Sequence, residues 1–158
     1  MTPAIAQLKA LHLDFEVLEY APDPSHPSYG LEAAQRLGVS PDLVYKTLIV
    51  TNGFSHFVAV VPVTHTLSLK KAAKAFGEKK LLMAAPREAE RVTGFLVGGI
   101  SPVGQRRQLD TRIEERARRL SKIYVSGGRR GLELGLAPGA LLEACHRGAW
   151  APLCIDSH

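Results

Sequence analysis

Two glycine-rich stretches, each following an apolar run and each carrying a pair of arginines, have the composition of ligand-binding loops. The first is VGGISPVGQRR at residues 97–107, and the second is VSGGRRG at residues 125–131. Glycine at the end of a strand lets the backbone approach another backbone or a ligand closely, and it lets N–H groups point outward. The two loops therefore either line one pocket for a polar ligand or are tight turns that need glycine for conformation alone.

The first stretch contains part of a phosphate-binding P-loop, because Gly99 and Gly104 have the spacing of G-x-x-x-x-G. That motif continues with a lysine for the phosphates and a Ser or Thr for magnesium. Here Gln105 and Arg106 follow, and Pro102 removes one backbone N–H from the cradle. No G-x-G-x-x-G is present either. These features argue against nucleoside triphosphate hydrolysis and against a dinucleotide cofactor.

The cysteines and histidines lack the spacing of a metal site or of a catalytic triad. Cys145 and Cys154 lie near the C-terminal end without a C-x-x-C, and the 6 histidines are scattered without an H-E-x-x-H. No Ser-His-Asp arrangement is recognisable. We therefore expect neither a metal nor another cofactor, and no disulfide framework.

Lys46 lies at the point where a short predicted helix gives way to a strand, between Tyr45 and Thr47. Most lysines are solvated surface residues, so this position alone does not distinguish a functional lysine from an ordinary one. Tyr20 and Tyr29 flank the proline-rich segment APDPSHPSYG, where aromatic side chains serve in rim packing or in ligand contact. Both interpretations remain open for these three side chains.

The elements that must position these residues are predicted from helix-end signals and from apolar runs. Thr2-Pro3, Ser40-Pro41, Pro86 and Pro138 are typical helix starts, while Gly38, Gly77 and Gly94 are typical helix ends. Asn52-Gly53 between two apolar runs predicts a β-hairpin. We expect helices at residues 3–11, 31–38, 68–77, 86–94 and 138–145, and strands at residues 15–20, 46–50, 54–63, 79–85, 95–100, 122–128 and 131–137.

The order of these elements favours a single α/β (α+β) domain with a mixed sheet, because helices and strands do not alternate strictly. The chain has 158 residues, 46% of them hydrophobic, which suits one globular unit. Its net charge of +5 and its clustered lysines and arginines favour a polyanionic partner such as nucleic acid. We expect a cytoplasmic protein without a membrane segment, because the sequence has no signal-like leader and no long apolar run.

Several long blocks resemble the YbaK/EbsC family, whose members include freestanding Cys-tRNA(Pro) deacylases. The blocks are TPAI, EAAQRLGVSPDLVYKTLIV, LSLKKAAKAFGEKKLLMA, TGFLVGGISPVGQRR and IYVSGGRRGLEL. The resemblance implies a single domain related to the editing insertion of prolyl-tRNA synthetases, with a partly barrel-like β-sheet surrounded by helices. It covers residues 1–145 and leaves residues 146–158 as an unassigned C-terminal tail.

The resemblance also implies a site. Lys46, the lysine of YKTL, corresponds to the family's catalytic residue. Around it, the resemblance places a substrate-binding set made of Tyr20, Tyr29, Thr47, Gly98, Gly99, Ile100, Ser126, Gly127 and Glu133.

The function implied is trans-editing, in which cysteine is removed from mischarged Cys-tRNA(Pro). The implied mechanism uses the thiol of the substrate itself, and the implied partners are aminoacylated tRNA and prolyl-tRNA synthetase. Two alternatives remain at this stage. One is an Ala-tRNA(Pro) deacylase that uses water, and the other is a tRNA- or synthetase-binding module without catalysis.

Overall fold

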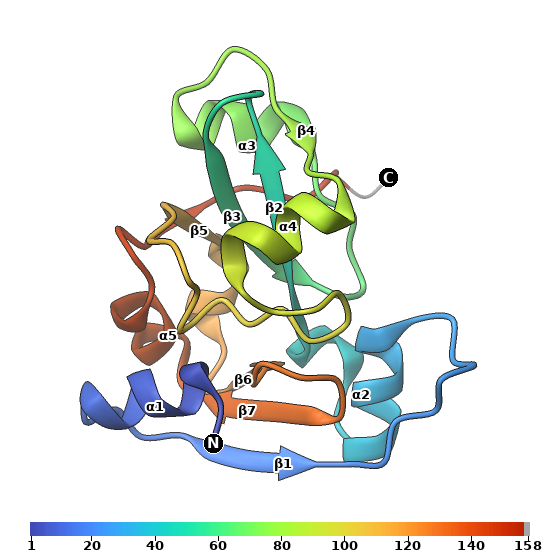
Figure 1. Cartoon of the computed structure of the whole chain (residues 1–158). Coiled ribbons are helices and arrows are strands. Elements are labelled where there is room, and N and C mark those ends of the chain that lie inside the picture. The colour runs from blue at the N-terminus through green and yellow to red at the C-terminus, as the bar shows by residue number, and fades with distance from the viewer. Residues whose placement is uncertain (157–158) are drawn as a thin grey trace.

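The computed structural model describes residues 1–156, which form two β-sheets with helices packed around them (Figure 1). A five-stranded sheet has the order β4-β2-β3-β5-β8, and a three-stranded sheet has the order β1-β7-β6. The strands are β1 (Glu16–Glu19), β2 (Tyr45–Thr51), β3 (His56–Pro62), β4 (Leu82–Met83), β5 (Thr111–Glu114), β6 (Ile123–Ser126), β7 (Leu132–Leu136) and β8 (Ala149–Ala151). The helices are α1 (Pro3–Ala10), α2 (Tyr29–Leu37), α3 (Leu69–Phe76), α4 (Pro86–Thr93) and α5 (Pro138–Ala144), with 3-10 turns η1 (Pro41–Leu43) and η2 (Glu115–Arg119).

The five-stranded sheet is mixed, which confirms the predicted fold class. β2 pairs antiparallel with β3 and with β4, whereas β3 pairs parallel with β5 and β5 pairs parallel with β8. The three-stranded sheet is antiparallel and lies below the β2–β3 hairpin in Figure 1. An isolated bridge between Val44 and Tyr124 links the two sheets. The sheets within residues 1–156 do not close into a barrel.

The C-terminal ends of α2 and α3 and the hairpin are found where their glycines predict them, whereas α2 begins at Tyr29, two residues before the predicted start. Ser28 and Ser68 each accept a hydrogen bond from a backbone N–H in the first turn of α2 and α3. Gly38 and Gly77 end these helices in the left-handed conformation, with φ of 69° and 70°. Gly53, with φ of 102°, forms part of the turn between β2 and β3. Local sequence signals thus determine where most of these elements begin and end.

The segment at residues 95–100 is not the strand that its apolar composition predicts. It forms a loop after α4, in which Leu96 is 74% exposed and Val97 donates its N–H to the carboxylate of Glu90 at 2.8 Å. Gly98 has φ of 94°, a conformation that strands do not adopt. This short apolar run is therefore a loop, which turns at Gly98 and is held by the hydrogen bond to Glu90.

The C-terminal segment, unassigned from the sequence, contributes an edge strand and buried side chains. β8 pairs with β5, and Leu153 and Cys154 are buried. The carboxylate of Glu114 accepts hydrogen bonds from the N–H groups of Leu153 at 2.9 Å and Cys154 at 3.2 Å. Arg116 also donates its Nε–H to this carboxylate at 3.0 Å. Glu114 thus holds the end of the described chain against β5.

No helix in the described part of the chain is both long and apolar enough to cross a membrane.

Replacing Glu114 by glutamine is expected to lower the free energy of unfolding at pH 7 by about 1–3 kcal/mol, because charge-assisted hydrogen bonds are lost. Burial opposes ionisation of this carboxyl group, but its hydrogen bonds outweigh burial and lower its pKa from 4.5 to about 2. Between these values the unfolded chain binds more protons than the folded one, so the wild-type protein loses this stability as the pH falls from 4.5 toward 2.

Urea unfolding at pH 7 and at pH 3 measures this effect. The difference between wild type and Glu114→Gln should be larger at pH 7 than at pH 3. Glu115→Gln, which changes an exposed neighbouring residue, is the control. Equal stability of Glu114→Gln and wild type at pH 7 would contradict the assignment.

Candidate active site

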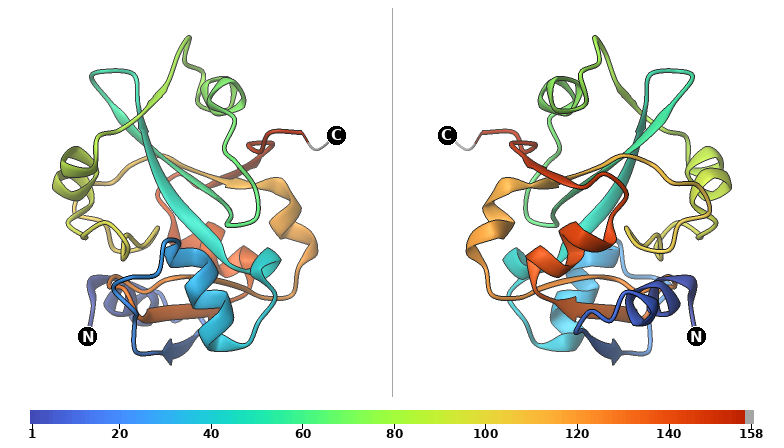
Figure 2. Two further views of the ribbon diagram at one scale, coloured as in Figure 1. Left: turned by 90° about the vertical axis from the view of Figure 1, so that its right-hand side faces the viewer. Right: turned by 90° about the vertical axis from the view of Figure 1, so that its left-hand side faces the viewer.

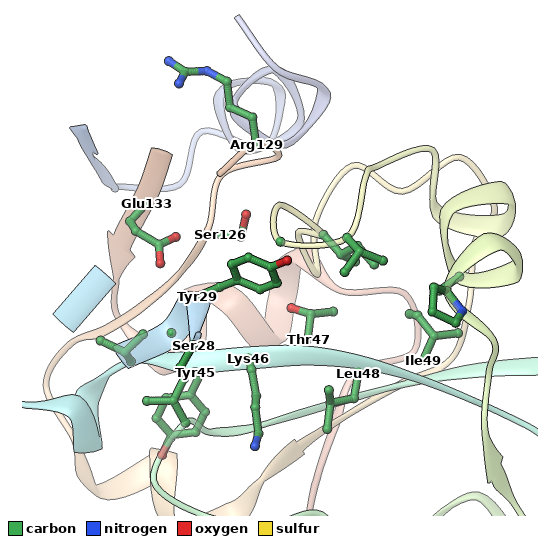
Figure 3. A pocket seen from close by; sticks show the side chains of 18 of the residues that line it. Ser28, Tyr29, Tyr45, Lys46, Thr47, Leu48, Ile49, Ser126, Arg129 and Glu133 are labelled. Carbon is green, nitrogen blue, oxygen red and sulfur yellow. The ribbon is translucent and has the colours of Figure 1, made fainter. Parts of the chain in front are cut away.

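A cavity of about 450 Å³ lies beside the N-terminal half of β2, where the two sheets approach each other (Figure 3). Its walls come from β2, from the start of α2, from the loop after α4, and from β6 and β7. Eight of the ten sequence-predicted site residues line it, namely Tyr20, Tyr29, Lys46, Thr47, Gly98, Ile100, Ser126 and Glu133. The remaining two, Gly99 and Gly127, do not.

The cavity exists because part of β2 has a free edge. β4 pairs only with Val50 and Thr51, and β6 meets β2 only at the bridge between Val44 and Tyr124, so the residues between these points have no strand paired with them on that side. Val63 donates its N–H to Val44 O at 2.8 Å on the β3 side. Alternate residues of an antiparallel strand direct their backbone groups to opposite edges. The N–H and C=O groups of Thr47 therefore point toward the cavity.

Lys46 and Thr47 lie on opposite faces of β2, as neighbours on a strand must (Figure 3). Burial lowers the pKa of the Lys46 ammonium, although the neighbouring Cys154 opposes this shift. No carboxylate within residues 1–156 pairs with Lys46. Thr47 points toward Tyr29 and Ser126, and its buried Oγ1 has no hydrogen-bond partner among the described residues. The Lys46 ammonium on one face of β2 and the Thr47 hydroxyl on the other are thus both available to bind a ligand.

Glu133 and Tyr20 form the wall opposite β2. Glu133 is paired with Ser126 across β6 and β7, and it is 93% buried, being only 7% exposed. Burial raises the pKa of its carboxyl group from 4.5 to about 8, so the group is largely protonated at pH 7. Burial also raises the pKa of Tyr20, and the negative charges of Glu133 and Glu32 add to this shift. This wall therefore offers hydrogen-bond donors without negative charge at neutral pH.

The two glycine loops contact each other as well as the cavity. A Cβ atom at Gly99 would lie 2.5 Å from Cα of Arg129, and one at Gly127 would lie 2.8 Å from Cγ of Leu132. The N–H of Gly99 donates to Leu96 O, and that of Gly127 donates to Leu132 O. Gly99 and Gly127 thus permit close packing of the loops, and their N–H groups are already used.

The neighbouring residues of the first loop are the ones that face the cavity. An added Cβ at Gly98 would lie 3.4 Å from the ring of Tyr29. The N–H groups of Gly98 and Ile100 donate to no other described residue, so they are available to a bound oxygen.

A buried ion pair near the cavity was not predicted from the sequence. Arg130 lies 3.1 Å from Glu32, and its guanidinium carbon is 4.6 Å from the centre of the Tyr29 ring. Burial of Glu32 opposes ionisation, but the N–H of Asp23 at 2.8 Å and the Arg130 guanidinium keep its pKa below the usual value. The sequence signal that could have indicated this ion pair is Glu32, an acidic residue three positions after Tyr29 on the inward-facing side of α2.

Arg129 also lines the cavity, although it was not among the predicted site residues. In Figure 3 its side chain points away from the labelled cluster, and it lies 3.4 Å from Glu19. Of the two consecutive arginines in the second loop, Arg129 thus makes a surface contact and Arg130 belongs to the buried ion pair with Glu32.

Neither cysteine has the properties of a catalytic nucleophile. Burial raises the pKa of Cys145 to about 12, and burial together with Glu114 raises that of Cys154 to about 12. Neither thiol lines the cavity. The thiolate is the reactive form of cysteine, so both thiols are inert near neutral pH. Within residues 1–156, no three His, Cys, Asp or Glu side chains gather as a metal site.

The fold is that of an aminoacyl-tRNA editing domain. The model of that family matches residues 27–144, and the chain belongs to this family. Among curated proteins, the "Putative Cys-tRNA(Pro)/Cys-tRNA(Cys) deacylase EbsC" of Enterococcus faecalis is 37% identical over 143 residues, covering 90% of this chain and 87% of that protein. The YbaK/EbsC resemblance noted from the sequence is therefore confirmed.

Solved structures show the same fold over the whole chain. A crystal structure of a hypothetical protein has a TM-score of 0.85 at 27% identity and covers 98% of this chain and 100% of its own. The "Crystal structure of a putative trans-editing enzyme for prolyl tRNA synthetase" has a TM-score of 0.81 at 24% identity and covers 99% of each chain. The latter similarity concerns the fold alone.

Replacing Glu133 by glutamine is expected to remove a pH-dependent loss of stability. Between pH 4.5 and about 8 the folded carboxyl group binds a proton that the unfolded one has released, so wild-type stability falls as the pH rises, by at most about 1.4 kcal/mol per pH unit. Urea unfolding at pH 5, 7 and 9 should show a smaller decline for Glu133→Gln. Glu143→Gln, an exposed residue, is the control. Parallel profiles for Glu133→Gln and wild type would show that Glu133 is not protonated at neutral pH.

Proposed function

We propose that this protein is a trans-editing deacylase that removes cysteine from Cys-tRNA(Pro). One observation carries the proposal: the edge of β2 beside the cavity carries an unpaired lysine, the cavity offers unused N–H and hydroxyl groups, and no cysteine or histidine of the described residues lines it. Such a site can bind and polarise an ester, but its hydroxyl groups have no histidine beside them to act as a base, so we assign the nucleophile to the substrate. The name of the EbsC relative, which specifies a Cys-tRNA substrate, supports cysteine as the esterified amino acid.

In the proposed reaction, the substrate supplies its own nucleophile. The cysteinyl sulfur attacks the carbon of its own ester, a four-membered thiolactone forms, and the bond to the terminal ribose oxygen breaks. The thiol proton passes to that oxygen, which leaves as the free tRNA hydroxyl, and water later opens the thiolactone. An intramolecular attack depends on positioning more than on a catalytic base. This requirement suits a cavity in which Glu133 is mostly protonated at pH 7.

The free edge of β2 orients the ester in this scheme. The N–H groups of Gly98 and Ile100, with the hydroxyl of Thr47, face the oxygen that becomes negative in the transition state. Lys46 approaches from the other face of β2 and binds the carbonyl oxygen or the terminal ribose. Tyr29 and Ser126 complete the wall against which the aminoacyl group packs.

The difficulty of distinguishing cysteine from proline by shape explains why a second, hydrolytic site would be needed. Cysteine fits a pocket shaped for proline, and a small difference in apolar shape is worth only about 1–3 kcal/mol of discrimination. An editing protein that acts on the released aminoacyl-tRNA supplies the remaining selectivity, which makes prolyl-tRNA synthetase the expected partner. We place the deacylase domain at residues 1–145, and the segment after it completes the five-stranded sheet through β8 (Ala149–Ala151). Its site of action is the cytoplasm.

Replacing Lys46 by alanine is expected to preserve the fold and to lower kcat/KM for Cys-tRNA(Pro) at least tenfold, about 1.4 kcal/mol or more. The change removes the unpaired cation of the cavity and little buried area. Single-turnover deacylation measures the rate, and circular dichroism measures the fold. Lys9→Ala, on the exposed side of α1, should retain wild-type turnover. A folded Lys46→Ala protein with wild-type turnover would remove Lys46 from the mechanism.

Exchanging the substrate thiol for a hydroxyl tests the chemistry directly. Ser-tRNA(Pro) is nearly isosteric with Cys-tRNA(Pro), but its hydroxyl is a much weaker nucleophile. We expect comparable binding and at least about a hundredfold slower deacylation. Comparable rates for the two substrates would exclude the substrate-assisted mechanism and leave the deacylase assignment intact.

The same assay, extended to Ala-tRNA(Pro), separates the two other candidate functions. A water-using alanine deacylase would hydrolyse the Ala and Ser substrates at similar rates, because they differ only modestly in size. A binding module without catalysis would hydrolyse none of them.

A further inference from the structure

A second hollow, separate from the active-site cavity, lies beside α3, and lysines surround it. We call it the lysine groove and define it by Lys70, Lys74, Lys79 and Lys80. All four lysines are exposed. The apolar part of its lining comes from Leu69, Ala73, Leu81 and Leu82.

The local structure brings the four lysines together. Lys70 and Lys74 are one turn apart on α3, so they share a face of that helix. Gly77 ends α3 in the left-handed conformation and redirects the chain, so that Lys79 and Lys80 border the same hollow. The opposite face of α3 is fixed by burial of Ala72. The grouping is therefore a rigid feature of this helix and its C-terminal turn.

These positive charges are not neutralised within residues 1–156. None of the four lysines forms an ion pair there, whereas Lys71 of the same helix lies 2.7 Å from Asp156. Glu78 also lines the groove, but its carboxylate accepts a hydrogen bond from Asn52. The groove consequently carries an excess of positive charge facing solvent.

The lysine groove and the active-site cavity adjoin at β4. Leu82 lines the groove, and the next residue, Met83, lines the cavity. Successive side chains of a strand point to opposite faces, so the two hollows lie on either side of β4. Because β4 is an edge strand and both residues are exposed, a molecule bound in the cavity can reach the lysines by passing round this edge.

A second group of basic residues, on η2, does not adjoin the active-site cavity. Arg118 and Arg119 lie on η2, which is on the opposite side of the β2–β3 hairpin from α4 (Figure 2). The loop after α4 lines the cavity, so η2 faces away from it. Arg118 and Arg119 thus provide a natural comparison with the lysine groove.

We propose that the lysine groove binds backbone phosphates of the RNA whose aminoacylated 3′ end occupies the active-site cavity. This inference rests on the proposed function and adds where the acceptor stem lies on this chain. Phosphates are spaced regularly along an RNA backbone, and flexible lysines bind them as point charges without reading sequence. The groove would supply affinity for any acceptor stem, while the cavity selects the amino acid.

The test compares two substrates that differ only in the RNA body. One is full-length Cys-tRNA(Pro), and the other is the cysteinyl ester of adenosine, which carries no phosphate. For the variant K70Q/K74Q/K79Q/K80Q, kcat/KM for the tRNA should fall at least tenfold at about 0.1 M salt, and its dependence on salt concentration should become weaker. Turnover of the adenosine ester should stay within about twofold of wild type.

Charge-matched double variants provide the control. K74Q/K79Q and R118Q/R119Q each remove two positive charges, but only the first should weaken turnover of the tRNA. Equal losses in the two double variants would overturn the inference, because net charge alone would then explain the effect. Unchanged kcat/KM and salt dependence in the quadruple variant would also overturn it. A loss seen only when prolyl-tRNA synthetase is present would assign the groove to a protein partner instead.

The failure of the underlying function gives a different result. If the wild-type protein hydrolyses neither the tRNA ester nor the adenosine ester, the deacylase proposal fails. If it hydrolyses both and the quadruple variant matches it on both, only the lysine groove fails.

Discussion

The unpaired edge at the start of β2 is the constraint on which the candidate site depends. The isolated bridge between Val44 and Tyr124 links the two sheets there, and β4 pairs with β2 only at Val50 and Thr51. Between these points, buried backbone groups need hydrogen-bond partners, which a ligand or solvent must supply. Strand alternation then places Lys46 on one face of this edge and Thr47 on the other. In the proposed mechanism, these two residues, adjacent in sequence, contact the ester from opposite faces of the strand.

The rest of the site is held in place by packing between segments that are distant in sequence. The two glycine loops touch at Gly99 and Arg129, which fixes the first loop against the second. The ion pair of Arg130 and Glu32 connects the second loop to α2. A buried pair of this kind gains little net stability because both charges lose their hydration. Its main consequence here is geometric, because Arg130 stacks on the ring of Tyr29 and limits where that ring can lie.

Charge is divided between two regions with different physical roles. On the face of β2 away from Tyr29 and Ser126, Lys46 is half-buried and has no carboxylate partner among residues 1–156, so an interaction with a ligand oxygen would be weakly screened. The lysines of the groove are exposed, so the contacts that we propose they make with a polyanion would each be weak and salt-dependent. A single desolvated cation suits an ester, and a solvated cluster suits RNA. The +5 net charge, read from composition alone, does not make this distinction.

The sequence by itself determined the features that depend on neighbouring residues. The ends of α2 and α3, the Asn52-Gly53 turn and the position of Lys46 at the start of a strand all follow from local conformational preferences. Family resemblance added the candidate residues, but only the tertiary structure decided which of them face the cavity. β5 and β8 were not predicted, because these short strands form by parallel pairing with distant segments. Residues 95–100 form a loop that turns at Gly98 and is held by Glu90, a residue of the preceding helix. Burial of Glu32 and the free edge of β2 likewise arise from contacts between remote parts of the chain, which local preferences do not encode.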